Sequence, residues 1–320
     1  MKKVSVLISN TNTCDVMRLC LQNLKKIKKE EYPELEVIVV DTSSRDDSVS
    51  MVEKEFSWVN VIVAPNNGLA ASLNIALKLA TGDYILYLGT DGFPKEGTIK
   101  GLVDYFENID NSKVGAATVK LLTRDGRQDM DGHRGLITPW TAFTHFTKLE
   151  LVFPKSKLFS GYFLTYKDLN KEHEIDACIT HFLFVRKGVQ DQVGSWDEDF
   201  VVYGEDIDMC YRIKELGWKI MYLPQFLAEH WKGVSVGRRI TSDVKTSNAG
   251  ITLKGVDYTK GELRVQMRIL STGAMKIFYD KHLRKKYPFF ITCVVMFVIK
   301  FMTILRIKAQ EITNKKMGIK

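Results

Sequence analysis

The sequence predicts an α/β protein with a mostly parallel central sheet, helices on both faces of that sheet, and a helical extension at the C-terminus. Over residues 1–120, short apolar runs alternate with segments of helical periodicity, which is typical of a parallel sheet. Over residues 241–320 this alternation is lost, and a long apolar run stands between clusters of basic residues. We therefore expect a main domain at 1–240 and an extension at 241–320.

The expected elements follow one another in a regular order. Strands are expected at 4–8, 35–40, 59–64 and 84–88, and later near 178–186 and 218–223. Helices are expected where apolar residues recur every three or four positions, at 16–27, 52–56, 69–80 and 205–216. Asp15 is the expected N-cap of the first helix, and Gly82 ends the third. No element is assigned within 121–175.

Composition and charge exclude several classes of protein. Of the 320 residues, 45% are hydrophobic, which is enough for a folded core and excludes general disorder. The five cysteines include no CxxC pair, so neither a disulfide framework nor a zinc ribbon is indicated, and a reducing compartment is expected. Residues 281–320 hold ten Lys or Arg and one acid, which gives this segment a net charge of +9. Because the whole chain has a net charge of +8, the rest of the chain has a net charge of −1. Because a nucleic-acid-binding protein spreads its cations over the folded body, no nucleic-acid partner is expected.

The apolar run at 288–305 indicates contact with a membrane. Its 18 residues are the lower limit for a helix that crosses a bilayer, and Lys300 interrupts it. The basic residues around it are attracted to anionic lipids. We therefore expect residues 281–320 to associate with a membrane surface, with a single complete span or a helix packed on protein as the alternatives. The apolar stretch at 4–8 is too short for a signal peptide, so the main domain is expected at the cytoplasmic face of the cell membrane.

Polar residues gather where the expected parallel strands end, which is where such sheets bind ligands. Asp41 ends the second strand, and Asp91 follows the fourth. Asn67 and Gly68 precede a helix, whose first N–H groups could face an anionic ligand. Asp91 could ligate a divalent cation that neutralises a diphosphate. Each of these residues is also common in ordinary turns and caps.

Acidic residues and a histidine in the second half suggest further chemistry. Glu205 and Asp206 open the helix expected at 205–216, where one carboxylate could act as a general base. Acids in a first turn also stabilise the helix dipole without any catalytic role. His230 could complete a metal site with Asp91, and histidine with carboxylate suits manganese better than magnesium. A lone histidine is more often structural.

Taken in order and spacing, these residues resemble the family 2 glycosyltransferases, which have the GT-A fold. Four segments carry the resemblance: VSVLISNTN (4–12), VIVVDTSSRDDS (37–48), NNGLAASLNIALKLATGDYILYLGTDGFP (66–94) and VGSWDEDFVVYGEDIDMCYRIKELGWKIMYLP (193–224). The last is the most specific, and His230 and Ser235 follow it at the family's spacing. Within the family, the likeness is greatest to rhamnosyl- and galactofuranosyl-transferase-like members that act on cell-surface polysaccharides.

The resemblance implies a nucleotide-binding half at 1–120 and an acceptor half at 121–240. Asp41 would contact a uracil or thymine base. The other residues expected at the nucleotide are Ser9, Asn10, Thr11, Asn67, Gly68, Asn74 and Thr90. Those expected to hold a divalent cation, Mn²⁺ or Mg²⁺, are Asp91 and His230. Asp206 would be the catalytic general base, with Glu205 as the rival candidate. Those expected at the acceptor are Trp196, Asp197 and His181.

Two departures from the family pattern affect the site. Gly89 stands where many relatives have a second acid, so Asp91 is the one remaining carboxylate of the metal motif. Thr180 and His181 stand where a small Gly-Ala pair is usual, which would narrow the acceptor pocket.

The resemblance implies an inverting glycosyltransferase that moves a sugar from a UDP- or dTDP-sugar donor to a hydroxyl of a glycan or lipid-linked saccharide. A non-catalytic nucleotide-sugar-binding or assembly subunit at the membrane is the alternative, because the metal motif is reduced. A nicotinamide dehydrogenase shares the alternating pattern, but the first strand here is not followed by a GxGxxG turn.

Overall fold

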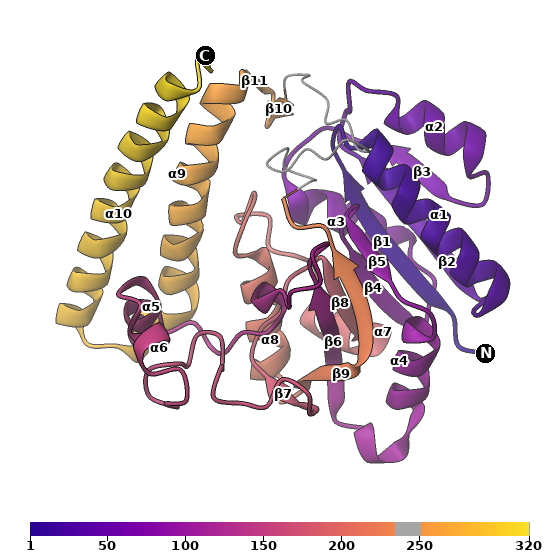
Figure 1. Ribbon diagram of the computed structural model, residues 1–320, viewed down its shortest axis with the longest axis horizontal. Coiled ribbons are helices and arrows are strands. Elements are labelled where there is room, and N and C mark those ends of the chain that lie inside the picture. Colours follow the sequence, from indigo (N-terminus) through magenta and orange to yellow (C-terminus); the bar gives the residue numbers. More distant parts are fainter. Residues whose placement is uncertain (234–250, 320) are drawn as a thin grey trace.

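The computed structural model describes residues 1–233 and 251–319 (Figure 1). Its strands are β1 (Val4–Asn10), β2 (Leu35–Asp41), β3 (Asn60–Val63), β4 (Tyr84–Leu88), β5 (Gly92–Pro94), β6 (Val114–Leu122), β7 (His173–Ile175), β8 (Phe182–Arg186), β9 (Lys219–His230), β10 (Ile251–Leu253) and β11 (Val256–Tyr258). Its α-helices are α1 (Cys14–Glu30), α2 (Ser48–Glu55), α3 (Leu69–Leu79), α4 (Thr98–Glu107), α5 (Pro139–Phe146), α6 (Leu149–Val152), α7 (Lys187–Val193), α8 (Glu205–Glu215), α9 (Lys260–Phe278) and α10 (Phe289–Lys316). Ser235 and the expected boundary between residues 240 and 241 lie outside the described residues.

The central sheet is mostly parallel, as expected. Its strands run in the order β3-β2-β1-β4-β8-β6-β9-β5, and β7 also pairs with β9. Strand β1 pairs in parallel with both β2 and β4, β2 pairs in parallel with β3, and β6 does so with β9. Strand β8 lies antiparallel between β4 and β6, and the short strands β5 and β7 are antiparallel to β9. The carboxyl ends of β1, β2 and β4 therefore meet at one edge.

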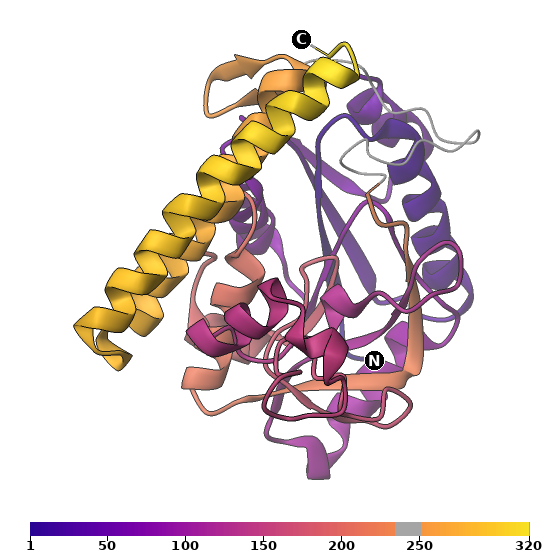
Figure 2. The same cartoon turned by 60° about the vertical axis from the view of Figure 1, so that its left-hand side comes forward.

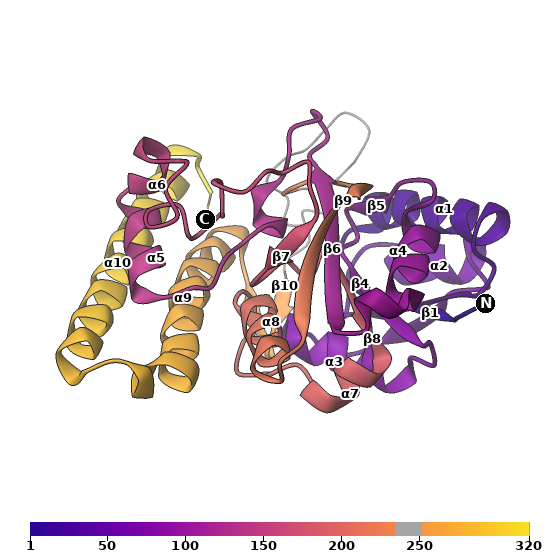
Figure 3. The ribbon, with the colours of Figure 1, turned by 90° about the horizontal axis from the view of Figure 1, so that it is seen from below.

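Helices cover both faces of this sheet (Figures 1 and 3). One face is buried under α1, α2 and α4, with core side chains such as Leu24 and Phe106. The opposite face is buried under α3, α7 and α8, with Leu73, Val189 and Met209. Because both faces are covered, the strands carry continuous apolar runs rather than alternating ones.

The first helix starts earlier than its periodicity indicates. The residues expected on its inner face are buried, including Val16 and Leu24. The prediction of Asp15 as the N-cap is wrong, because α1 begins at Cys14. The Cys14 N–H donates to Oδ2 of Asp46 at 3.0 Å, so the loop after β2 satisfies a first-turn amide that the helix leaves open.

The region that sequence periodicity left unassigned, 121–175, contains α5, α6 and β7. Helix α5 starts with a capping box, in which Thr138 and Thr141 bond each other's backbone N–H groups and Pro139 occupies the first turn. A helix of eight residues gives too little periodicity to be recognised from apolar spacing alone.

The C-terminal extension forms a helical hairpin of α9 and α10 beside the main domain (Figures 1 and 2). At its base, Phe278 and Leu283 belong to a buried cluster with Phe200 of the main domain. His282 also places its Nε2 2.7 Å from Oδ1 of Asp208 on α8. The extension is therefore attached to the main domain through α8. By length and composition alone, α10 could cross a membrane.

Candidate active site

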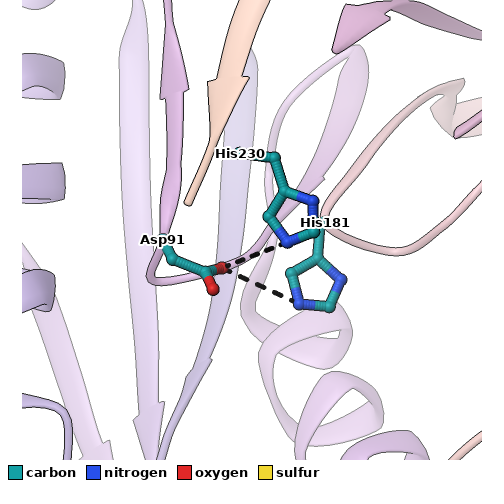
Figure 4. Close-up of side chains that lie close together, drawn as sticks. All are labelled: Asp91, His181 and His230. Carbon is teal, nitrogen blue, oxygen red and sulfur yellow. Dashed lines mark ion pairs between the residues drawn. The ribbon is translucent and has the colours of Figure 1, made fainter. Parts of the chain in front are cut away.

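Three side chains converge at the carboxyl edge of the sheet (Figure 4). Asp91 lies between β4 and β5, His181 immediately precedes β8, and His230 ends β9. The Nε2 atoms of both histidines lie 3.8 Å from Oδ1 of Asp91. One potential ligand atom from each residue lies within 4.8 Å of the others. The expected pairing of Asp91 with His230 is thus present, and a second imidazole joins it.

Backbone pairing fixes this arrangement. Gly92 pairs with His230 across β5 and β9. The Trp231 N–H donates to the carbonyl of Asp91 at 2.9 Å. The Gly89 N–H donates to the carbonyl of His181 at 3.2 Å. The three side chains are therefore carried by hydrogen-bonded backbone rather than by independent loops.

A carboxylate behind His230 sets its orientation. The Nδ1 of His230 lies 2.7 Å from Oδ2 of Asp129, so Nδ1 donates its proton to Asp129 and Nε2 is left facing Asp91. Lys232 donates from Nζ to the other Asp129 oxygen at 2.9 Å. Burial lowers the pKa of His230, but the bond to Asp129 and the charge of Asp91 outweigh it and raise the pKa overall.

The donor set fits a divalent cation. Two imidazole nitrogens and one carboxylate oxygen suit manganese better than magnesium, which prefers oxygen ligands alone. Both histidines form ion pairs with Asp91 at 3.8 Å, which brings the three potential ligand atoms together. The side chain of His181 remains 32% exposed, which leaves the cluster open to a ligand on that side.

Gly89 and His181 depend on each other. A Cβ at Gly89 would lie 2.5 Å from Cδ2 of His181 and 2.8 Å from Oδ1 of Asp91, both closer than real contacts. An acid at position 89 would therefore occupy the space that the imidazole fills. His181, expected at the acceptor, lies against Asp91 and His230. The two departures from the family pattern thus occupy one place, where an imidazole stands in the space of a carboxylate.

Asp206 and Glu205 open α8, as predicted, and a buried arginine joins them. Arg134 donates from Nη2 to Oδ2 of Asp206, and both side chains are nearly buried, at 9% and 10% exposed. The Ile207 N–H donates to the other Asp206 oxygen at 2.8 Å. Burial lowers the pKa of Arg134, but the carboxylate of Asp206 more than compensates, so the pKa is raised. Asp206 therefore faces a permanent cation.

Glu205 is in a different environment from its neighbour. Burial, followed by the nearby charge of Asp206, raises the pKa of Glu205 to about 8, so its carboxyl is mainly protonated at neutral pH. The side chain of Thr180, the residue before His181, lowers the pKa of Glu205 slightly, so the two residues are close to each other. The pKa of His181 is lowered mainly by burial, while Asp91 and, more weakly, Asp206 oppose that shift. The start of α8 and the Asp91–His181–His230 cluster therefore lie in one region.

The chain enters α8 through two left-handed residues, Tyr203 at φ 73° and Gly204 at φ 84°. A left-handed conformation at a tyrosine costs about 1 kcal/mol or more. A Cβ at Gly204 would also lie 3.0 Å from the ring of Phe200. This turn aims Glu205 and Asp206 toward the sheet edge.

Four of the residues expected at a nucleotide, Ser9, Asn10, Thr11 and Asp41, lie where β1 and β2 end. Asn10 pairs in register with Asp41 and donates from Nδ2 to Oδ2 of Asp41 at 2.6 Å. Ser72 donates from Oγ to Oγ of Ser9 at 2.7 Å, and Thr11 shares a hydrogen bond with Thr42. Asp41 and Thr90 are buried, whereas Asn67 is exposed.

Gly68 and Asn74 have structural partners. A Cβ at Gly68 would lie 2.4 Å from the carbonyl oxygen of Val201, and Gly68 has φ 107°, so this position favours glycine. Asn74 donates from Nδ2 to the carbonyl of Trp196 at 3.0 Å, and its Oδ1 accepts the Trp196 N–H at 2.8 Å. Asn74 therefore fastens the segment after α7 to α3.

Trp196 and Asp197 lie in the segment after α7, which lines a shallow pocket together with Glu198 and Arg212. The Trp196 side chain is buried, at 1% exposed, with its ring edge-on to Tyr87 at 4.8 Å between centroids. Asp197 accepts a hydrogen bond from Lys281 of the C-terminal extension, and Lys281 also donates to Asp199 at 2.6 Å. In this structure Trp196 packs in the core and Asp197 contacts the extension, and their expected place at the acceptor stays a prediction.

Sequence reasoning missed two residues of the site, Asp129 and Arg134. Both lie in the segment after β6, where no element had been assigned. The feature of the sequence that pointed to these two residues was the run DMDGHR at 129–134, which gathers charged residues and a histidine in a stretch of weak periodicity.

Comparisons with known proteins show the family to which this chain belongs. Residues 5–193 match the family model described as "Glycosyl transferase family 2". That match covers more than half of the chain, so the protein belongs to the family 2 glycosyltransferases. The O-antigen biosynthesis protein RfbC of Myxococcus xanthus is 25% identical over 73% of this chain and 18% of its own length. The rhamnosyltransferase WbbL of Escherichia coli is 26% identical over 52% of this chain and 59% of its own.

The N-acetylglucosaminyl-diphospho-decaprenol L-rhamnosyltransferase of Mycobacterium tuberculosis is 30% identical over 30% of this chain and 31% of its own. The chain thus spans between 18% and 59% of the length of these three relatives.

Two solved structures share the fold. The mannosyltransferase PcManGT of Pyrobaculum calidifontis, in complex with GDP-Man and Mn²⁺, superposes with a TM-score of 0.53 at 14% identity over 98% of this chain and 75% of its own. GalNAc-T7 with UDP, GalNAc and Mn²⁺ superposes with a TM-score of 0.54 at 14% identity, over 88% of this chain and 49% of its own. The expected GT-A fold is thereby confirmed.

Proposed function

We propose that this protein is an inverting, cation-dependent glycosyltransferase of cell-surface glycan synthesis, which takes a UDP- or dTDP-sugar as donor and a saccharide or lipid-linked saccharide as acceptor. The observation that carries the proposal is the Asp91–His181–His230 cluster beside the carboxylates that open α8. Names of relatives in O-antigen and decaprenol-linked rhamnosyl transfer support the substrate class.

The donor diphosphate would lie at the cluster. Asp91, His181 and His230 would hold the cation, and Asp129 would keep Nε2 of His230 directed at it. A bound divalent cation supplies positive charge that offsets the charge developing on the leaving diphosphate. Asp41 and Asn10, where β1 and β2 end, are the proposed contacts of the base.

Asp206 is the proposed general base. The acceptor oxygen forms a bond to the anomeric carbon as the bond to the diphosphate oxygen breaks, and Asp206 takes the hydroxyl proton. One displacement from the opposite face inverts the anomeric centre. Asp206 forms an ion pair with Arg134, whereas the raised pKa of Glu205 keeps that group protonated at neutral pH, so Glu205 is the poorer candidate for the base.

The alternative of a non-catalytic binding subunit rested on the missing acid at position 89. His181 lies in the space of that acid, so the reduced motif still has three donors. This arrangement favours the enzyme.

The test is release of nucleoside diphosphate from a panel of UDP- and dTDP-sugars with Mn²⁺ present. We expect Asp206→Asn to lower the rate about 10²–10⁴-fold and Asp91→Ala to abolish its dependence on Mn²⁺. Asp104→Asn, at an exposed carboxylate on α4, is the matched control and should leave the rate unchanged. Unchanged rates in both site variants would refute the roles assigned here.

A further inference from the structure

Helix α10 exposes many of its large apolar side chains to solvent, while the side that packs on the protein is mixed and includes Val295 and Met296. Its buried residues are Thr292, Gln310 and Asn314, all of them polar. Its exposed residues include Phe289, Phe290, Val294, Phe297, Phe301, Ile304 and Leu305. A helix of a soluble domain normally shows the reverse pattern. An apolar face of this length on a protein surface marks contact with a membrane or with another protein.

Polar contacts hold α10 along α9 from one end of the hairpin to the other. The hydroxyls of Tyr279 and Thr292 are 2.9 Å apart near the turn. Gln310 accepts from Nε of Arg268 at 3.1 Å. Farther along, Asn314 donates from Nδ2 to the carbonyl of Gly261 at 3.0 Å.

These contacts restrict how α10 can meet a bilayer. To cross the hydrocarbon, α10 would have to leave α9 or take it along. Helix α9 carries charged side chains such as Arg268 and Lys276, which are costly in hydrocarbon. Its end is also fixed to the main domain through Phe278. A hairpin that stays intact therefore lies along the bilayer surface.

A second apolar surface lies beside α10. Helices α5 and α6 and the loop after them lie next to α10 on the same side of the molecule (Figures 1 and 3). The guanidinium of Arg306 on α10 lies 5.7 Å from the ring centroid of Phe146 on α5. The exposed apolar residues of this segment are Trp140, Phe143, Phe146, Leu151, Val152, Phe153 and Leu158.

The charges of this second surface suit anionic lipid. Lys148, Lys155 and Lys157 are exposed among its apolar residues. The acid of the segment, Glu150, is buried and accepts a hydrogen bond from His145 at 2.6 Å. Apolar side chains with a rim of lysines are typical of segments that lie in a membrane interface.

Side-chain contacts connect this second apolar surface to Asp206, the proposed general base. The His145 ring stacks on Tyr162, with 4.0 Å between ring centroids. Tyr162 in turn lies beside Arg134: burial raises the pKa of this tyrosine and the guanidinium lowers it. Arg134 is paired with Asp206. Contacts between neighbouring side chains thus connect α5 to the Arg134–Asp206 pair.

We propose that α10 and the segment 139–158 form a single membrane-contacting face, on which the protein lies with α10 along the surface of an anionic bilayer and Asp206 toward a lipid-linked acceptor. This inference rests on the acceptor class proposed above. It adds a second contact, independent of the C-terminal tail, and it excludes a transmembrane α10.

Sedimentation of the full chain with vesicles of equal parts phosphatidylglycerol and phosphatidylcholine tests the second contact. Leu151→Glu/Val152→Glu should weaken binding about tenfold or more. Phe297→Glu/Phe301→Glu on α10 should weaken it at least as much, and Ile109→Glu, an exposed residue of the main domain, should have no effect.

The outcomes separate this inference from the proposed membrane association. If only the α10 variant loses binding, the second contact is wrong and the tail alone anchors the protein. If the unaltered chain stays in the supernatant, membrane association itself fails. A lipid-free dimer that Leu151→Glu/Val152→Glu converts to monomer would show that a second copy covers this face, and would overturn the inference.

Two further measurements test the geometry. Brominated lipids should quench tryptophan emission of the unaltered chain more than that of Trp140→Phe, while Trp218→Phe, in the main domain, should keep the full quenching. A tag placed after Lys320 should remain open to trypsin added outside the vesicles. A protected tag would mean that α10 crosses the bilayer, contrary to the proposal.

Discussion

The proposed exchange of a carboxylate for an imidazole at the candidate metal cluster gives the sharpest test of the site. His181 would supply one of three ligand atoms, and its Nε2 lies 3.8 Å from Oδ1 of Asp91. Substitutions behind a metal ligand typically lower metal affinity about 10–100-fold. Loss of a direct donor should reach the upper end of that range. We expect His181→Ala to weaken Mn²⁺ binding about 100-fold, which corresponds to about 2.8 kcal/mol.

The compensating variant follows from the contacts of Gly89. An aspartate at 89 alone would have its Cβ 2.5 Å from the His181 ring, so Gly89→Asp should displace the imidazole and should not improve binding. Gly89→Asp combined with His181→Ala removes that overlap and returns an acid to the site. We expect the double variant to recover affinity to within about tenfold of the unaltered protein, because carboxylate oxygen is also a good manganese ligand.

The assay is the electron paramagnetic resonance signal of free Mn²⁺ during titration, with and without UDP, so that binding is measured without turnover. His173→Ala, at a histidine of β7 outside the cluster, is the matched control. Mn²⁺ binding by His181→Ala equal to that of the unaltered chain would refute the assignment of His181. A double variant no better than His181→Ala would refute the exchange between positions 89 and 181.

Three further outcomes are expected. Asp129→Asn should weaken Mn²⁺ binding about 10–100-fold in the same titration, because it loosens the orientation of His230. Glu205 holds a proton in the folded state that the unfolded chain loses above its ordinary pKa of 4.5, so the free energy of unfolding should fall as the pH rises from 4.5 to about 8. Glu205→Gln should remove that part of the decline, measured as urea midpoints at acidic and alkaline pH; parallel pH profiles for the two proteins would contradict the raised pKa. Arg134→Met leaves the carboxylate of Asp206 buried without its cation and should lower the free energy of unfolding by about 3–5 kcal/mol, whereas Arg134→Met/Asp206→Asn should recover much of it in chemical denaturation.

The order of helices and strands could be predicted because the local spacing of apolar residues indicates each element. Buried residues of α1 recur at the expected spacing, and the strands of a sheet covered on both faces are continuous apolar runs. The pairing of Asp91 with His230 was also accessible, because both follow strands whose ends meet at one edge. Short helices were missed: α5 begins with a capping box that apolar spacing does not reveal.

By itself, the sequence determined the fold class, the edge of the sheet that carries polar residues, the acids that open α8 and the unusual apolar tail. Tertiary structure alone decided that His181 joins Asp91 and His230, that Asp129 stands behind His230 and Arg134 beside Asp206, and that Trp196 is buried. These partners are separated by tens of residues, such as the 72 between Arg134 and Asp206. Their meeting depends on how strands and loops pack and on irregular register, such as the shift between Val119 and Lys120 where β6 pairs with β9. The local spacing of apolar and polar residues does not predict such long-range packing.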